Sequence, residues 1–145
     1  MGTGPYTLDY DPKSGQNEFV SNEVSWTRMG HLLFIDARQS GFSYSIMVKD
    51  SEIQEARFRE FNAQNFTPFF DAADFIRALL RFLSAHPGLR SNPVILVGES
   101  YGGLRATTML HMLLNYGSYR DGGETYQDPA LVSEIEDHYR AVFPD

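Results

Sequence analysis

A serine lies between two glycines where an aliphatic run gives way to a helical pattern. Residues Gly98–Gly102 read GESYG, follow the run Val94–Val97 and precede an apolar stretch over 104–116. The spacing G-x-S-x-G between a strand and a helix is that of a sharp turn that projects a nucleophilic serine. Glycines two positions before and after the serine remove side-chain collisions and permit unusual backbone angles. The pattern predicts that Ser100 attacks an acyl carbon.

The residues around Ser100 would stabilise the charge that forms on the attacked oxygen. The N–H of Tyr101 is expected to point at the developing oxyanion, and the helix that begins near Gly102 adds its positive end. The alternative interpretation is an ordinary strand, turn and helix with a serine on the surface. A phosphate-binding loop is disfavoured, because the segment lacks the lysine of a P-loop and the glycine spacing of a dinucleotide site.

Short apolar runs alternate with helical patterns on both sides of this turn. The predicted elements are a strand at 31–36, a helix at 72–87, a strand at 94–97, and helices at 104–116 and 129–142. Thr67 could cap the first helix, with Pro68 at its first position. Extended pieces near 6–8 and 18–20 flank a turn at 9–17. The order strand, helix, strand, helix predicts an α/β fold with a parallel sheet and covering helices.

The same patterns predict where the core lies. Both apolar strands are expected to be buried, and the helix over 104–116 is expected to be covered on most sides. We also expect four aromatic side chains to pack in the core, namely Trp26, Phe34, Phe42 and Tyr44.

Composition restricts the classes of function. The chain has 145 residues, about one domain, and 42% of them are hydrophobic, which is enough for a core. Its formal net charge of -7 disfavours binding to nucleic acid or to an anionic membrane surface. With no cysteine, disulfides and thiolate metal sites are excluded, and we expect neither metal nor cofactor. No apolar run is long enough for a membrane span, no signal peptide is visible, and the compartment and oligomeric state stay open.

Three stretches together resemble the serine carboxypeptidases, a family of the α/β-hydrolase superfamily. GESYGG at 98–103 is similar to the family's nucleophile motif. Within 22–45, a tryptophan, an aliphatic strand ending in Asp36 and a turn reading GFSYS resemble a second family segment. GPY at 4–6 is similar to the family's Gly-Pro-Phe, so that the resemblance covers about residues 4–117.

The resemblance implies a role for each residue of the nucleophile motif. Ser100 would form the acyl-enzyme, and Tyr101 would supply an oxyanion N–H and line the pocket with its ring. Glu99 matches an acid that helps to hold the terminal carboxylate of the substrate, as one half of a carboxylic pair. The partner acid's place is taken by Gly2, and Arg38 is either a substitute anchor for a carboxylate or an exposed loop arginine.

A serine nucleophile also needs a histidine base and a carboxylate that orients the base. In α/β-hydrolases both follow the serine in the chain. His31 is expected on the wrong side of the sheet, His86 at a helix end, and His111 too far along the helix that follows Ser100. His138 is the remaining candidate and falls in a predicted helix. The family's Asn-Gly-Gly-Pro oxyanion loop has no counterpart here, so we expect an internal piece of a longer protein.

These observations predict one partial α/β-hydrolase domain over residues 1–145, with 118–145 as the start of a cap insertion. The predicted function is that of a serine carboxypeptidase-like hydrolase that cleaves peptide bonds through an acyl-enzyme on Ser100. Tyr101, Glu99 and Gly102 would contribute to the oxyanion and substrate sites. Two alternatives stay open: an esterase or aminopeptidase of the same fold acting on an ester or peptide, or a non-catalytic interaction module.

Overall fold

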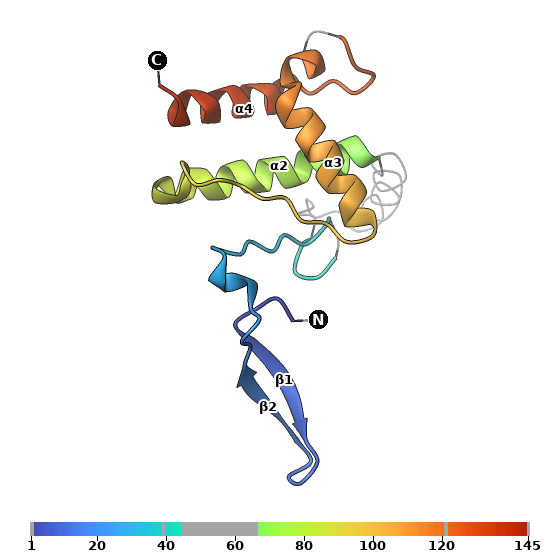
Figure 1. Ribbon diagram of the computed structural model, residues 1–145. Coiled ribbons are helices and arrows are strands. Elements are labelled where there is room, and N and C mark those ends of the chain that lie inside the picture. The colour runs from blue at the N-terminus through green and yellow to red at the C-terminus, as the bar shows by residue number, and fades with distance from the viewer. Residues whose placement is uncertain (1, 39, 45–66, 121, 145) are drawn as a thin grey trace, which may run out of the picture. The chain divides into compact units, whose positions relative to one another are not determined.

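The structure is a computed structural model that describes residues 2–38, 40–44, 67–120 and 122–144 (Figure 1). The chain divides into two compact units, Met1–Phe34 and Ile35–Asp145.

The first unit contains an antiparallel hairpin of strands β1 (Tyr6–Asp11) and β2 (Gln16–Ser21). The pairing runs from Tyr6 opposite Ser21 to Asp11 opposite Gln16. The carboxylate of Asp11 accepts hydrogen bonds from two turn amides, and Gly15 closes the turn with a φ of +70°, which favours glycine. The two predicted extended pieces are confirmed, but the turn between them is shorter than predicted because both strands extend into it.

The two faces of the hairpin differ in polarity. Because side chains alternate along a strand, one face carries apolar residues and the other carries acids. The apolar face has Leu8 directly opposite Phe19, with Tyr6 and Tyr10 on the same face. All four of these side chains are exposed within the described structure.

The second unit contains three α-helices among its described residues: α2 (Pro68–Ala85), α3 (Tyr101–Leu114) and α4 (Pro129–Val142). The Oγ1 of Thr67 caps α2 by accepting a hydrogen bond from the N–H of Phe70 at 3.3 Å, and Pro68 is the first helical residue. The predicted cap and the bounds of α4 are confirmed. Helix α3 begins at Tyr101, earlier than the predicted Leu104.

The core of this unit lies between the helices. Helix α4 lies alongside α2, and α3 crosses α2 (Figure 1). Helix α2 contributes the largest share of the buried side chains. The core residues are Ala72, Ala73, Phe75, Ile76, Leu80, Met109, Met112, Tyr119, Leu131, Val132 and Ile135. Burial of these apolar side chains is the main source of stability for the unit.

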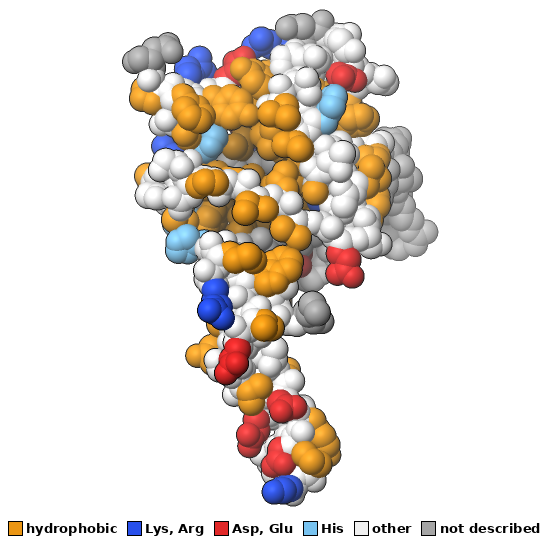
Figure 2. Space-filling model, viewed as in Figure 1, with side chains coloured by type: hydrophobic (Ala, Val, Ile, Leu, Met, Phe, Trp, Pro, Cys, Tyr) orange, Lys and Arg blue, Asp and Glu red, His pale blue; other side chains and the backbone are white. Residues whose placement is uncertain are grey.

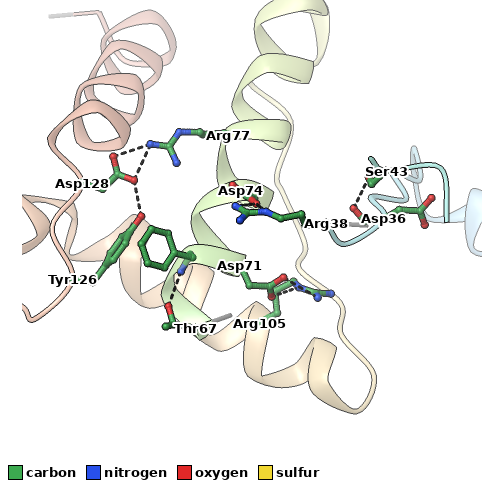
Figure 3. A network of polar contacts seen from close by, with 11 residues as sticks. Asp36, Arg38, Ser43, Thr67, Asp71, Asp74, Arg77, Arg105, Tyr126 and Asp128 are labelled. Carbon is green, nitrogen blue, oxygen red and sulfur yellow. Dashed lines mark hydrogen bonds and ion pairs between the residues drawn. The ribbon is translucent and has the colours of Figure 1, made fainter. Parts of the chain in front are cut away.

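A stripe of charged residues on α2 forms ion pairs with three other segments (Figure 3). These residues recur at helical spacing, so they share one side of α2. Asp71 pairs with Arg105 of α3, Asp74 with Arg38 of the segment after residue 35, and Arg77 with Asp128 at the start of α4. Helix α2 is therefore joined by ion pairs to α3, to the start of α4 and to the segment of Arg38.

The predicted parallel sheet is not present among the described residues. Residues 31–36 and 94–97 are extended, but neither segment belongs to a strand of the described structure. Only Ile35 and Leu96 of these segments pack against the core. Without a paired neighbour, Ile95 is 81% exposed, and the prediction that both segments are buried is wrong for the described part of the chain.

Other apolar residues that were assigned to the core are also exposed. Phe42 is 96% exposed, and Trp26, Phe34 and Tyr44 are likewise open to solvent. Helix α3 has only Met109 and Met112 buried, so its predicted cover on most sides is wrong for the described structure. Figure 2 shows many hydrophobic side chains on the viewed face of the second unit. The physical reason is the same as for the extended segments, because no described element lies against these side chains.

The carboxylate of Asp128 is the centre of a polar contact between α2 and the start of α4. Its two oxygens accept hydrogen bonds from Arg77 at 2.7 and 2.8 Å, from the Tyr126 hydroxyl at 2.7 Å, and from the Leu131 N–H at the start of α4. Burial works to raise the pKa of Asp128, but the hydrogen bonds from Tyr126 and Arg77 outweigh it and hold the pKa below its ordinary value.

We predict that Asp128→Asn lowers the free energy of unfolding by about 1–3 kcal/mol at neutral pH, because charged hydrogen bonds are lost. The folded pKa lies below the ordinary value of 3.8, so the carboxylate stabilises the fold above 3.8. This stability is lost as the pH falls through the folded pKa. Urea unfolding of both forms at stepwise lower pH should therefore show the difference shrinking in acid.

Asp137→Asn is the matched control for this prediction, because Asp137 pairs with Arg140 where both side chains are more than 70% exposed. An exposed pair of this kind contributes little to stability. A difference between wild type and Asp128→Asn that stays constant down to pH about 2 would contradict the assignment.

Candidate active site

The backbone of Ser100 has a conformation that residues other than glycine rarely adopt. Its φ is 56° and its ψ is -124°, and it is the only non-glycine residue with positive φ in the described part of the chain. Such a conformation costs about 1–3 kcal/mol and persists only where the surroundings fix it. The predicted sharp turn at the end of residues 94–97 is therefore present, and a helix follows it directly.

The two glycines of the motif have different roles. A Cβ on Gly98 would collide with the carbonyl oxygen of Gly102 and lie 2.6 Å from the nitrogen of Gly103. A Cβ on Gly102 would meet no atom within 4 Å beyond its neighbours and its own helix. The predicted collision is confirmed for Gly98, before the serine. For Gly102, after the serine, the prediction of a collision is wrong. The turn brings two backbone segments together at Gly98, so that this position alone requires the absence of a side chain.

Backbone hydrogen bonds close the turn and leave the serine hydroxyl uncommitted. The N–H of Gly102 bonds to the Glu99 carbonyl at 2.8 Å, and the N–H of Gly103 bonds to the Ser100 carbonyl at 3.0 Å. Ser100 is the N-cap residue of α3, but its side chain makes no capping hydrogen bond. A serine at an N-cap ordinarily uses its oxygen for the cap, so this hydroxyl is available for other chemistry.

Tyr101 is the first residue of α3, and an N–H at this position has no partner within the helix. The positive end of the helix dipole adds to the field at this amide. The Tyr101 side chain is 47% exposed, and its ring centre lies 5.5 Å from the Cζ of Arg105. Glu99 is exposed as well. Glu99, Ser100, Tyr101 and Gly102 therefore lie at the start of α3, and their roles in an active site stay predictions.

Arg38 is partly buried in an ion pair with Asp74, so the prediction of an exposed loop arginine is wrong. Its Nε donates to Oδ2 of Asp74 at 2.8 Å, and its side chain is only 24% exposed. This pair also satisfies the charge that would be needed to hold a substrate carboxylate. The alternative of a substitute anchor loses its support for the same reason.

The second motif forms a turn that is organised by Asp36 (Figure 3). Its carboxylate accepts a hydrogen bond from the N–H of Phe42 at 2.8 Å, and its carbonyl accepts one from the hydroxyl of Ser43 at 2.9 Å. Gly41 has a φ of +54°, and a Cβ there would collide with the carboxylate of Asp36. The turn therefore needs both an acid at the end of the extended segment and a glycine five positions later.

The histidines of the described structure form no hydrogen bond with Ser100. The Nδ1 of His111 lies 2.6 Å from the Tyr119 hydroxyl, and the uninterrupted helix keeps His111 near the far end of α3. His86 is the C-cap of α2, where it was predicted. Burial and the nearby charge of Arg90 lower the pKa of His138. Within the described residues, no cluster of three or more His, Asp or Glu side chains could hold a metal ion.

Comparison with known proteins places these features in one family. The sequence model of the family described as serine carboxypeptidase matches residues 1–123. The chain belongs to the serine carboxypeptidase family. Membership implies the α/β-hydrolase fold, in which a nucleophilic serine lies on a strained turn between a strand and a helix. No solved structure matched the chain.

The similar proteins include plant and yeast members of the family. Serine carboxypeptidase-like 10 of Arabidopsis thaliana is 29% identical over 97% of this chain and 31% of its own length. Serine carboxypeptidase-like 8 of the same plant is 31% identical over 80% of this chain and 24% of its own length. The pheromone-processing carboxypeptidase KEX1 of Saccharomyces cerevisiae is 30% identical over 90% of this chain and 17% of its own length.

The chain therefore spans no more than about a third of the length of these relatives. Among the described helices, none is both long and apolar enough to cross a membrane.

The sequence analysis missed two residues close to this site, Asp71 and Arg105. They form a bidentate ion pair between the first turn of α2 and the second turn of α3. The sequence offered one signal, an arginine one helical turn after the motif tyrosine, whereas an acid in the first turn of a helix is common. Their pairing across the fold could not be deduced from one sequence.

We predict that Gly98→Ala destroys the turn and Gly102→Ala does not. The alanine at 98 would force backbone apart, whereas the alanine at 102 enters open space at the start of a helix. In the protein as its host makes it, labelling of Ser100 by a serine-reactive probe should fall at least tenfold in the first variant and about twofold or less in the second. Equal losses in the two variants would contradict the geometry.

Proposed function

We propose that this chain carries the nucleophile of a serine carboxypeptidase-like hydrolase and that Ser100 forms an acyl-enzyme during peptide-bond cleavage. The observation that carries the proposal is the strained backbone of Ser100 at the start of α3, in a chain that belongs to this family. A serine that makes no capping hydrogen bond and lies in a strained turn directly before a helix has the backbone geometry of a nucleophile elbow, and its activation would come from a base.

In the proposed reaction, the Oγ of Ser100 attacks the carbonyl carbon of the scissile bond. The N–H of Tyr101 donates to the oxyanion, where a helix N-terminus favours negative charge. The leaving amine departs with a proton from the base, and water then attacks the acyl-enzyme and releases the product acid. No cofactor takes part in these steps.

The base and its orienting carboxylate are proposed to come from residues that the structure does not place beside Ser100. In α/β-hydrolases both follow the serine in the chain. Residues 118–145 would then be the start of a cap insertion, and 1–145 part of a single domain. In that domain, segments 31–36 and 94–97 would be strands of a parallel sheet, which would cover the apolar side chains that are exposed here.

Glu99 is proposed to bind the terminal carboxylate of a peptide. It is exposed and adjacent to the nucleophile, and a protonated carboxyl group can donate a hydrogen bond to a carboxylate. The acid that would share this task in the family has Gly2 in its place. This substitution is the specific observation in favour of the second candidate function, an esterase or aminopeptidase of the same fold.

We predict that a fluorophosphonate labels wild-type protein at Ser100 and that Ser100→Ala abolishes labelling. The experiment uses the protein as its host makes it, and mass spectrometry locates the label. Ser133→Ala is the control, because Ser133 is an exposed serine on α4 that bonds only to its own helix. Labelling that survives Ser100→Ala would sink the proposal. A folded wild type that is never labelled would support a non-catalytic module.

We also predict that Glu99→Ala raises KM for peptides with a free C-terminus by about tenfold, the effect of one charged hydrogen bond. Glu99→Gln keeps a donor and should stay within about threefold of wild type. Peptides with an amidated C-terminus should not distinguish the three forms. If both kinds of peptide are affected equally, Glu99 does not recognise the carboxylate, and the esterase or aminopeptidase assignment gains.

A further inference from the structure

One bidentate ion pair joins the first turn of α2 to Arg105 of α3, which lies one helical turn after Tyr101 (Figure 3). The Nε of Arg105 donates to Oδ2 of Asp71 at 2.6 Å, and a terminal nitrogen donates to Oδ1 at 3.1 Å. Both side chains are less than a fifth exposed. Parallel hydrogen bonds from a guanidinium to a carboxylate fix the relative orientation of the two groups as well as their distance.

The same guanidinium also lies against two aromatic rings. Its Cζ lies 4.0 Å above the centre of the Phe75 ring and 5.5 Å from the centre of the Tyr101 ring. Phe75 follows Asp71 by one helical turn on α2, and Tyr101 precedes Arg105 by one helical turn on α3. Arg105 therefore lies against the acid and ring of α2 and near the ring of the residue next to Ser100.

This contact bears on the strained backbone. The conformation of Ser100 is unfavourable by itself and must be maintained by its surroundings. The close approach of Gly98 to Gly102 and the backbone hydrogen bonds from Gly102 and Gly103 span the turn. On its C-terminal side, α3 is tied to α2 through Arg105. Because two of its nitrogens are bonded to Asp71, the effect of Arg105 on Ser100 would be to fix the position of α3.

We propose that Arg105, oriented by Asp71, is a positioning residue: it fixes the first turn of α3 and the ring of Tyr101, and thereby the attack geometry of Ser100. The proposal rests on the proposed function in so far as Ser100 is the nucleophile. Lysine could not take over this task, because its ammonium is a point charge without the planar fork that both pairs and stacks.

The test compares Arg105→Met, Arg105→Lys and the control Arg77→Met in the protein as its host makes it. Arg77 suits as a control because it also forms a partly buried ion pair on α2, with Asp128, away from Ser100. Fluorophosphonate labelling is resolved into the binding constant KI and the maximal rate kinact. We expect kinact to fall about 10–100-fold in Arg105→Met with KI unchanged, as for a misplaced nucleophile.

Arg105→Lys should recover the melting temperature in part while kinact stays low, and Arg77→Met should lower the melting temperature without changing kinact. An unchanged kinact in Arg105→Met, with Ser100 still labelled, would overturn the positioning role and leave the proposed function intact. Full recovery of kinact by lysine would overturn the claim that the fork is required.

Hydrogen exchange supplies a second measurement that needs no reaction at Ser100. Amides in a peptide covering residues 98–106 should exchange faster in Arg105→Met than in wild type, and should be unaffected in Arg77→Met. If wild-type protein is not labelled, the proposed function fails, and this measurement still decides whether Arg105 holds the turn. Equal exchange in Arg105→Met and wild type would then overturn the inference.

Discussion

The positive φ of Ser100 costs conformational free energy, and the surrounding structure has to supply it. Two kinds of contact do so. The backbone of Gly98 packs directly on the backbone of Gly102, at a distance that excludes any side chain, and hydrogen bonds from Gly102 and Gly103 close the turn. These main-chain contacts close the turn itself, and the serine side chain makes no capping hydrogen bond within it. That division leaves the hydroxyl free for chemistry.

Helix α2 connects this turn with the rest of its unit. Its apolar side packs into the core, and its charged side forms ion pairs with three separate segments. Asp71 and Asp74, on successive positions of that side, bind the segments that carry the two sequence motifs. Partly buried ion pairs add less net stability than apolar burial but are strict about geometry. The helix thus contributes stability through one side and orientation through the other.

The helices were predictable because their signals are local. Thr67 and Pro68 mark the start of α2, and the apolar spacing over residues 129–142 defines α4 by itself. The serine turn was predictable for the same reason, since five neighbouring residues specify it. The two extended segments at 31–36 and 94–97 were not, because a strand exists only through a partner, and the described part of the chain holds none for them. Their apolar composition indicates that such segments pack against other apolar elements, but it does not show whether those elements are present.

The ion pairs between distant residues were also not predictable from one sequence. Asp71 and Arg105 lie 34 positions apart, and nothing local to either residue names the other. A carboxylate in the first turn of a helix is favourable through the helix dipole alone, so that Asp71 has a sufficient local explanation without any partner. Asp71 meets Arg105 only because α3 crosses α2 in the folded structure. Residues that act through such a crossing are therefore found by structure, while those that act through a turn are found by pattern.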